Sequence, residues 1–383
     1  MKTFCYVGSW SLTPGTAKGL TVYEYDEPSG RLKKLGTEGG QYNIGGTFLD
    51  EKRKILYIAD ESTGNPDFLA GGGGRIAAFR IDPESGMLTE ICNGLSYGAN
   101  PSYIAIDRES SYMLVANHGS RAFVTKTKTD ADGNISIDVS FDESSLVLFR
   151  LNEDGTFEKP CDIFRFAGHG DKPYQTGPHA HCVVGSPDGN FYAVCDKGAD
   201  NLYLFRLDRE KGKIILCQGS PIKRSRASAP RYCIFHREEP YLFINKEYRS
   251  IVSSFKYNED GALEFISSEN ALPEGIDEPT GAGQSDICID ASGKYIYELI
   301  RGVNAISVFE AGNSGRLKRI QTVLDACISG RGCKISPDGR FLVASENKAD
   351  RVSSYPIGPD GKIGPAVEAA SQNMAATIDF IRL

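Results

Sequence analysis

The stretch HCVVGSPDGNFYAVCDKGADNLYLFRLDREKGKIILCQ, residues 181–218, decides the fold of this chain. It holds four short apolar segments, HCVVGS, NFYAVCD, NLYLFRLD and KIILCQ, with the turn sequences PDG and EKG between them. Glycine accepts the positive φ that tight hairpin loops need. The stretch therefore predicts four antiparallel strands joined by short connections.

The same unit recurs along the whole chain. Its first strands begin near residues 47, 102, 181, 232, 287 and 333, a spacing of about 50 residues apart from a longer gap after 102. One further copy reads RYCIFH, PYLFINKE, IVSSFKYNEDG and LEFISS from Arg231. Another reads GCKIS, PDGRFLVAS, RVSSYPIGPDG and KIGPAV (residues 362–367) from Gly332. The repeat predicts six complete units of four strands each.

A seventh unit is split between the two ends of the chain. The segments FCYVGS, GLTVYEYDEPSG and RLKKLG near the N-terminus supply three strands, and residues 375–381 have the pattern of the missing first strand. We therefore predict an all-β fold, a seven-bladed β-propeller of four antiparallel strands per blade, closed by pairing of the N- and C-terminal segments. We expect a single domain over residues 1–383. Small residues near the first strands, Ser102, Ala180 and Gly332, suit a crowded central channel.

Composition narrows the functional classes. The chain has 40% hydrophobic and 24% charged residues and a net charge of −7. Because it has one short basic cluster, KRSR at residues 223–226, which we interpret as a solvated loop, we expect no nucleic-acid partner. No apolar run approaches the roughly 20 residues that cross a bilayer. The N-terminus enters a strand pattern with no apolar leader segment, so we expect a cytoplasmic protein that does not bind membranes.

The ten cysteines are scattered along the chain, and six lie inside apolar strand-like runs, where we expect them to act as small buried hydrophobes. No CxxC pair occurs, and no histidine stands at zinc-ligand spacing from Cys327 and Cys333. We therefore expect no metal site, no cofactor and a reduced compartment.

Two insertions interrupt the repeat. The loop NPDFLAGGGG, residues 65–74, lacks the Lys-Ser/Thr of a phosphate-binding loop, so it does not predict a nucleotide site. Residues 121–144 are polar and rich in Thr, Lys and Asp, and they account for the longer gap after residue 102. We interpret them as an extended hairpin or loop that shapes a cleft or a subunit contact.

Propeller ligands bind at one mouth of the central channel, so polar residues at equivalent ends of the blades are the candidates for function. His179 and His181 stand at the first strand of one blade, and Arg231 stands at the matching place in the next. Other polar residues follow the second strands, at Asn117-His118, Asp196-Lys197, Lys246-Glu247, Arg301-Gly302 and Glu346-Asn347. Among these positions we expect substrate contacts from His118, His179, Lys246, Glu346 and Asn347.

These residues also carry a family resemblance. Over nearly its full length the chain resembles the seven-bladed propeller lactonases, which include bacterial 6-phosphogluconolactonases and the fungal 3-carboxy-cis,cis-muconate lactonizing enzyme. The marks are Pro178-His179-Ala180-His181, Ala229-Pro230-Arg231, Glu247, and Arg301-Gly302 followed by Asn304. The resemblance implies a catalytic group of His181, Arg231, Glu247 and Arg301, with His179 supporting His181 by hydrogen bonding.

The residue types suit the implied chemistry. Arginine binds a phosphate or carboxylate with bidentate geometry. Opening a lactone also needs a base to activate water and a donor for the oxyanion of the tetrahedral intermediate. Glu247 or His181 can be the base, and Arg231 or Arg301 can hold either the oxyanion or the acid group. Taken alone, the two arginines and the glutamate also fit a structural salt bridge between blades.

The resemblance implies a hydrolase that opens a small anionic sugar lactone, 6-phosphogluconolactone, in carbohydrate metabolism and the pentose phosphate pathway. The alternatives are a muconate-type cyclase and a non-catalytic propeller that binds a sugar acid or a protein. Where the family often has polar residues, this chain has Lys246, Tyr232, Val303 and the pair Leu299-Ile300. These departures surround the catalytic group and leave the exact substrate open, and the oligomeric state has no sequence signal.

Overall fold

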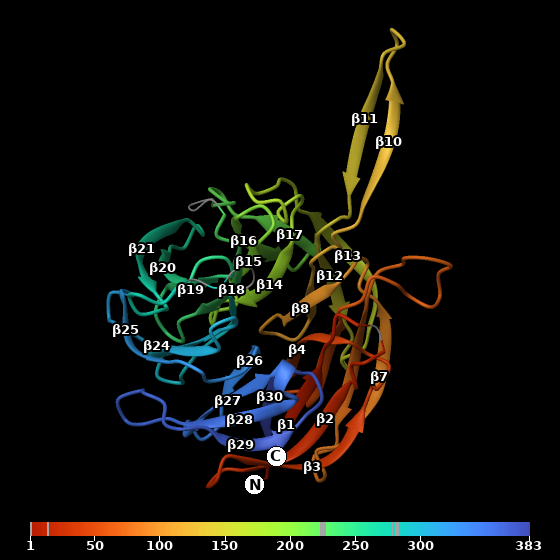
Figure 1. Cartoon of the computed structure of the whole chain (residues 1–383). Coiled ribbons are helices and arrows are strands. Elements are labelled where there is room, and N and C mark those ends of the chain that lie inside the picture. The colour runs from red at the N-terminus through yellow and green to blue at the C-terminus, as the bar shows by residue number, and fades with distance from the viewer. Residues whose placement is uncertain (1, 14, 223–226, 278, 280–282) are drawn as a thin grey trace.

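The protein is described by a computed structural model that covers residues 2–13, 15–222, 227–277, 279 and 283–383. Seven four-stranded antiparallel sheets stand in a ring (Figure 1), which confirms the predicted seven-bladed β-propeller. The basic cluster at residues 223–226 lies outside the described residues. The helix found in the described chain is a single 3₁₀ turn, η1 (Asn347–Ala349), so no described helix is long and apolar enough to cross a membrane.

The blades follow one another along the chain. Blade 1 contains β30 (Ala375–Arg382), β1 (Thr3–Ser9), β2 (Leu20–Asp26) and β3 (Arg31–Glu38). Blade 2 contains β4 (Ile44–Asp50), β5 (Ile55–Asp60), β6 (Arg75–Ile81) and β7 (Leu88–Leu95). Blade 3 contains β8 (Pro101–Ile106), β9 (Tyr112–Asn117), β12 (Ser145–Leu151) and β13 (Phe157–Arg165). Blades 4 and 5 contain β14 (Ala180–Gly185), β15 (Tyr192–Asp196), β16 (Asn201–Asp208) and β17 (Lys213–Leu216); and β18 (Pro230–Phe235), β19 (Tyr241–Lys246), β20 (Ile251–Tyr257) and β21 (Leu263–Asn270). Blades 6 and 7 contain β22 (Gln284–Ile289), β23 (Tyr295–Ile300), β24 (Ala305–Ala311) and β25 (Leu317–Val323); and β26 (Gly330–Ile335), β27 (Phe341–Glu346), β28 (Arg351–Pro356) and β29 (Val367–Ser371).

The two ends of the chain close the ring. β30 pairs antiparallel with β1, with Thr3 opposite Arg382 and Val7 opposite Ile378. The backbones of Lys2 and Leu383 exchange two hydrogen bonds of 2.8 and 2.9 Å, and the two termini lie together in Figure 1. The innermost strand of each blade contacts the innermost strand of the next, from β4 round to β30. The predicted closure is therefore confirmed.

The second strand of a blade is buried on both faces, which is why its sequence is a continuous apolar run. Every residue of β5 (ILYIAD) and β9 (YMLVAN) is buried. A blade packs against a neighbour on each of its two faces, so both faces of a second strand lose contact with water. The outer strands alternate instead between buried and exposed residues, as in β3.

The fourth strand of blade 7 differs from the prediction. We predicted residues 362–367, whereas the strand is β29, Val367–Ser371. Pro365 has no N–H to donate to a ladder, and the backbone N–H and C=O of Ile363 are bound by the side chain of Gln321 in blade 6. Before Pro365 the chain makes only an isolated bridge between Ile363 and Ile357 and a 2.8 Å hydrogen bond from Gly364 N–H to Pro356, and the regular ladder with β28 begins after it.

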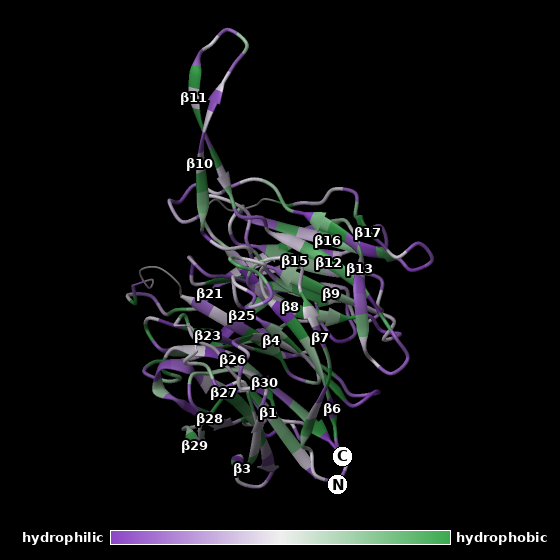
Figure 2. Ribbon diagram, turned by 90° about the vertical axis from the view of Figure 1, so that its right-hand side faces the viewer, coloured by the Kyte–Doolittle hydropathy of each residue, from purple (hydrophilic) through white to green (hydrophobic). Residues whose placement is uncertain are grey.

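The insertion at residues 121–144 is a hairpin, one of the two forms that we predicted. Its strands β10 (Phe123–Thr129) and β11 (Ile135–Phe141) pair with each other and form a separate two-stranded sheet. The hairpin projects away from the propeller in Figures 1 and 2.

Small residues line the contacts between inner strands, as the sequence predicted. A Cβ on Gly332 would lie under 3.0 Å from the backbone oxygen of Ala376 in the next blade, and a Cβ on Gly46 would lie equally close to that of Ser102. The Ser102 hydroxyl in turn donates a 3.0 Å hydrogen bond to the backbone oxygen of His181. Side chains larger than these would push the inner strands apart.

We predict that Gly332→Ala destabilises the propeller by about 2 kcal/mol, because the added methyl overpacks a contact between two backbones. Urea unfolding of the full chain measures the change. The matched control is Gly40→Ala, since a Cβ on Gly40 meets nothing within 4 Å. An equal effect of both substitutions would contradict the close packing of the inner strands.

Candidate active site

Each blade brings two equivalent positions to the same mouth of the channel. In every blade the pairing of the first strand with the second is interrupted by a register shift near its start. A bulge of this kind re-aims a side chain. The residues at or beside the shifts are Gly45, Ser102, His181, Arg231, Ser285, Arg331 and Ala376. The residues that follow the second strands are Trp10, Glu61, His118, Lys197, Glu247, Arg301 and Asn347.

Glu247 is the centre of one side of this mouth. It follows β19, its backbone N–H donates to the oxygen of Ala229 over 2.8 Å, and its own oxygen accepts from Gly283 over 2.9 Å. The buried carboxylate accepts hydrogen bonds of 2.8 Å from Lys197 Nζ and 2.8 Å from Arg301. Arg231 Nε lies 3.8 Å from the same carboxylate. Three blades therefore bring three cations to one anion.

The three cations control the charge state of Glu247. Burial alone would raise the pKa of Glu247, but the charges of Lys197, Arg301 and Arg231 outweigh it and hold the pKa well below its usual value. Burial lowers the pKa of Lys197, and the Glu247 carboxylate opposes that shift. Glu247 is therefore ionised at neutral pH, and both of its oxygens are engaged.

Arg231 is buried more deeply than Arg301. Its guanidinium donates to the backbone oxygen of Ser285 and lies over the ring of Tyr232, 4.4 Å from the ring centroid. The side chain of Arg231 is 2% exposed, whereas that of Arg301 is 17% exposed. Arg301 is thus the more accessible of the two arginines.

Three histidines pack together beside these cations. The rings of His118 and His179 stack with centroids 4.4 Å apart, and His181 meets His118 edge-on at 5.5 Å and Tyr232 at 5.2 Å. His179 Nδ1 lies 3.0 Å from the backbone oxygen of His118, so it carries the proton and donates. The expected hydrogen bond from His179 to His181 is therefore wrong, since His179 Nε2 and His181 Nδ1 are both without partners in the described part of the chain. The Asp196 carboxylate accepts the backbone N–H of His179 over 2.7 Å, which fixes the start of β14.

His181 is a neutral imidazole at neutral pH. Burial lowers its pKa well below the usual value, and the charges of Arg231 and Lys197 lower it further. Its Nδ1 is buried and has no hydrogen-bond partner among the described residues. Burial likewise lowers the pKa of His179 to about 4 and that of His118 well below its usual value. The histidine side of the mouth therefore carries no charge of its own.

A second charged group comes from blades 7, 1 and 2. Arg331 and Glu61 form a 3.1 Å ion pair, and the Arg331 guanidinium lies 3.3 Å from the centroid of the Trp10 ring. Gly45 leaves room for this carboxylate, since a Cβ there would lie under 3.0 Å from Glu61. Burial raises the pKa of Glu61, while the charges of Arg331, Arg231 and Lys197 oppose the shift, which places the pair within electrostatic range of the Glu247 cluster.

Of the nine site residues chosen from the sequence, six lie in these clusters and three lie elsewhere. Lys246 lines a separate cavity of about 250 Å³ with Asp200 and Ile222. Glu346 accepts hydrogen bonds from Arg351 and the backbone of Ile328. Lys246 and Glu346 are the last residues of their strands, one position before the residues that reach the mouth. Because successive side chains of a strand point to opposite faces, the side chains of Lys246 and Glu346 point away from it. Asn347 instead donates to the backbone oxygens of Trp10, Met374 and Ala375, so it ties blade 7 to the closing blade.

Four residues of these clusters were not among the nine chosen from the sequence, although Lys197 was noted there with Asp196 as a polar residue that follows a second strand. Lys197 occupies the same place after its second strand as Glu247, and so do Glu61 and Trp10. Arg331 occupies the same place in its first strand as Arg231. The repeat frame was therefore the signal that could have identified all four.

Among the residues that the structure describes, one group of three cysteine thiols is close enough together to hold a metal ion. The sulfur atoms of Cys182, Cys195 and Cys233 lie within 4.8 Å of one another, and all three residues are buried. The sequence did not suggest this group because Cys233 is in the next blade and no short spacing links it to the other two. Cys182 directly follows His181 in β14, so its side chain points to the opposite face of the strand.

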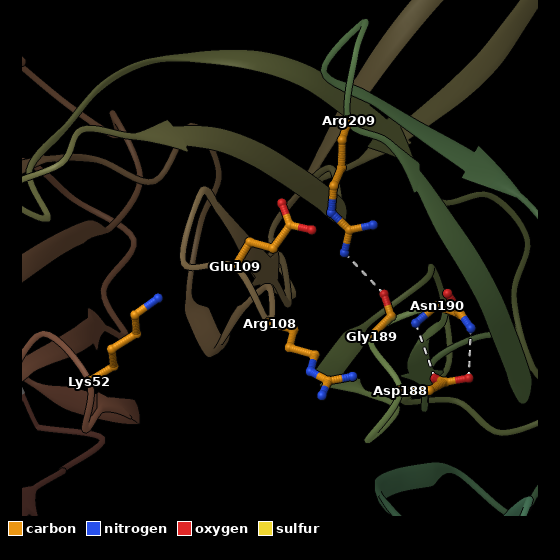
Figure 3. A pocket seen from close by; sticks show the side chains of 7 residues that line it. All are labelled: Lys52, Arg108, Glu109, Asp188, Gly189, Asn190 and Arg209. Atoms are coloured by element: carbon orange, nitrogen blue, oxygen red, sulfur yellow. Dashed lines mark hydrogen bonds between the residues drawn. The ribbon is translucent and has the colours of Figure 1, made fainter.

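A cavity of about 450 Å³ lies at the other ends of the strands (Figure 3). Its charged lining residues, Lys52, Arg108, Glu109, Asp188 and Arg209, belong to or border the turns that follow first and third strands. Arg209 forms a 3.2 Å ion pair with Asp107, and its guanidinium also donates to the backbone of Gly189. None of the candidate site residues borders this cavity.

Comparisons with known proteins agree with this architecture. A family model described as "Lactonase, 7-bladed beta-propeller" matches residues 4–380. The chain is 27% identical over 347 residues to a 6-phosphogluconolactonase of Bacillus subtilis, covering 90% of this chain and 88% of that protein. It is 27% identical over 353 residues to a 6-phosphogluconolactonase of Formosa agariphila, covering 91% and 90%. The structure of the Pseudomonas aeruginosa periplasmic gluconolactonase superposes with a TM-score of 0.85 at 21% identity, covering 100% of this chain and 99% of that one. The chain therefore belongs to the seven-bladed β-propeller lactonase family, and it is a lactone hydrolase.

Proposed function

We propose that the substrate is an anionic sugar-acid lactone, 6-phosphogluconolactone, which the enzyme hydrolyses to 6-phosphogluconate. One observation carries this proposal: three cations converge on a single buried carboxylate beside a neutral histidine. The names of the two curated relatives support the same substrate.

The charge balance of the Glu247 cluster favours a phosphorylated ligand. Lys197, Arg231 and Arg301 carry three positive charges and Glu247 carries one negative charge, so this carboxylate leaves two positive charges uncompensated. Glu61 is paired with Arg331. Asp286 and Glu298 also lie within electrostatic range of Arg231; the Asp286 carboxylate accepts the backbone N–H groups of Ile287 and Cys333, and burial raises the pKa of Glu298 well above its usual value. A phosphate monoester carries about −1.5 to −2 charge at pH 7. A bound phosphate would therefore neutralise the cluster.

His181 fits the base better than Glu247 does. A general base must be unprotonated and have a lone pair to offer. Glu247 meets the first condition only, because both of its oxygens already accept hydrogen bonds from cations and its pKa is held far below neutral pH. His181 is neutral, so one of its ring nitrogens carries a lone pair. Its Nδ1 is closed off from solvent, so the lone pair that meets water is the one on Nε2.

The reaction then runs in two steps. His181 accepts a proton as water attacks the lactone carbonyl, and the carbonyl oxygen becomes an oxyanion. The oxyanion collapses, the bond from the carbonyl carbon to the ring oxygen breaks, and His181 returns its proton to that oxygen. Arg301, the more accessible arginine, holds the anion of the substrate. Glu247 keeps Lys197 and the two arginines in place, and the nearby positive charges stabilise the oxyanion.

We also propose that the enzyme works in the cytoplasm. All ten cysteines are free. Cys182 and Cys233 have sulfur atoms only 3.7 Å apart and remain unbonded, as suits a reducing compartment. To test this location, washed cells are separated into periplasmic and cytoplasmic fractions, and each fraction is blotted for the chain. Recovery of the chain in the periplasmic fraction would contradict a cytoplasmic location.

We predict that Arg301→Ala lowers kcat/KM for 6-phosphogluconolactone at least ~10-fold, since it removes a charge-assisted contact with the phosphate. The loss for unphosphorylated glucono-δ-lactone should be only a few-fold. Rates of lactone opening, corrected for hydrolysis in buffer, measure both. Arg31→Ala, at an exposed position of an outer strand, is the control. If wild type prefers the unphosphorylated lactone, the phosphate-binding role is wrong.

We predict that kcat/KM for glucono-δ-lactone, which has no phosphate to titrate in this range, stays constant as the pH falls through 6.5 and declines only well below it. Burial and positive neighbours disfavour the imidazolium form of His181, so the base stays unprotonated to lower pH than an exposed histidine would. His181→Gln should lower kcat at least ~100-fold, whereas His236→Gln, in a turn between β18 and β19, should not. An acid limb at or above pH 6.5 would exclude a neutral buried His181 as the base.

A further inference from the structure

The hairpin β10–β11 is an unusual surface feature of this propeller. We call residues 123–141 the arm. Its two strands pair only with each other, and Figure 1 shows them extending into solvent beyond all the blades. Its base is closed by a 2.8 Å hydrogen bond from Ser120 N–H to the Asp142 carboxylate. An isolated two-stranded hairpin is only marginally stable in water, so an arm of this length calls for a covering partner.

The register gives the arm two different faces. Phe123 stands opposite Phe141, Thr125 opposite Val139, Thr127 opposite Ile137 and Thr129 opposite Ile135. Because these pairs are two residues apart along the strands, all eight side chains lie on one face. The other face carries Lys126, Lys128, Ser136, Asp138 and Ser140, with a 2.8 Å ion pair between Lys128 and Asp138, and one apolar residue, Val124, which is 58% exposed. Figure 2 shows hydrophobic segments along both strands of the arm.

The face that carries Phe123 and Phe141, which we call the apolar face, leaves a large apolar surface in contact with water. Its five large apolar residues are exposed by 63% (Phe123), 74% (Ile135), 66% (Ile137), 43% (Val139) and 40% (Phe141). At roughly 150–200 Å² for each fully exposed side chain, they leave ~500 Å² of apolar surface in water. A patch of that size on one small element marks an interaction site.

We propose that the apolar face is a dimer contact, in which the arms of two copies of this chain pack face to face and antiparallel across a two-fold axis. Two such faces would bury ~1,000 Å² of apolar side chain, which reaches the size of a specific interface. One surface can supply both halves, because a two-fold contact is made from the same patch on each subunit.

The ends of the arm are complementary in the same arrangement. The turn at its tip carries Asp130 and Asp132, and its base carries the exposed Arg121 beside two carboxylates, those of Asp142, which binds the Ser120 N–H, and Glu143, which pairs with Arg165. An antiparallel pair places the acidic tip of each arm near the base of the other. Arg121 is also within electrostatic range of His179 and Tyr248, so the dimer forms on the side of the propeller that holds the candidate active site.

Sedimentation of the full chain tests the contact with a matched pair of substitutions. Ile137→Asp puts a charge on the apolar face, and Ser136→Asp puts the same charge one residue away on the polar face. We expect a wild-type dimer, a dissociation constant raised at least ~30-fold by Ile137→Asp, and little change with Ser136→Asp. Wild-type lactone opening and thermal unfolding in both variants show that the propeller is intact.

Cross-linking separates arm-to-arm packing from other dimers. Thr127→Cys lies near the middle of the apolar face and should form a disulfide between subunits under mild oxidation, whereas Lys126→Cys on the polar face should not. A monomeric wild type overturns the proposal, as does a dimer that both aspartates weaken equally or not at all. A dimer weakened by Ile137→Asp alone but not trapped through Thr127→Cys would show that the face contacts another surface of the partner, and would overturn arm-to-arm packing.

Discussion

Pairing of β30 with β1 is the constraint on which the rest of the structure depends. It joins the two ends of the chain in one sheet and closes seven inner strands into a ring. In a closed ring an error in one blade cannot be absorbed at a free edge, so the inner strands meet through small residues such as Gly46 and Gly332. The same closure turns equivalent positions of seven blades into neighbours around one mouth.

The mouth shows how the fold uses this equivalence. Glu247, Arg301 and Lys197 each follow the second strand of their blade, yet they meet in one cluster. Moving these charges out of water is costly, and the burial effect on the pKa of Glu247 and Lys197 shows that cost. One carboxylate for three cations is an incomplete balance, which the proposed anionic ligand would complete. The electrostatic arrangement is therefore adapted more to binding than to stability.

Equivalent positions nevertheless serve different ends. Asn347 stands where Glu247 stands in its blade, but its amide binds the backbone of the closing blade. Trp10 and Arg331 form a cation–π contact on the side where the chain ends meet. Near the closure these positions therefore hold neighbouring blades together through the Asn347 hydrogen bonds and the Arg331–Trp10 contact. The charges proposed for catalysis lie farther from the closure, in blades 4 to 6.

The sequence by itself determined the seven four-stranded blades, the closure and six charged or histidine residues of one mouth, because strand patterns and turn residues repeat with a regular period. It did not determine the fourth strand of blade 7, where Pro365 and a long-range contact from Gln321 delay pairing. It also could not separate Glu247 from Lys246, since one residue of register decides which side chain faces the channel. Only the tertiary structure brought Lys197, Glu61 and Arg331 into the charge network. Burial in the tertiary structure also lowered the pKa of His181. The charge network and this pKa shift both arise between residues that are far apart in the sequence, so the sequence alone did not predict either one.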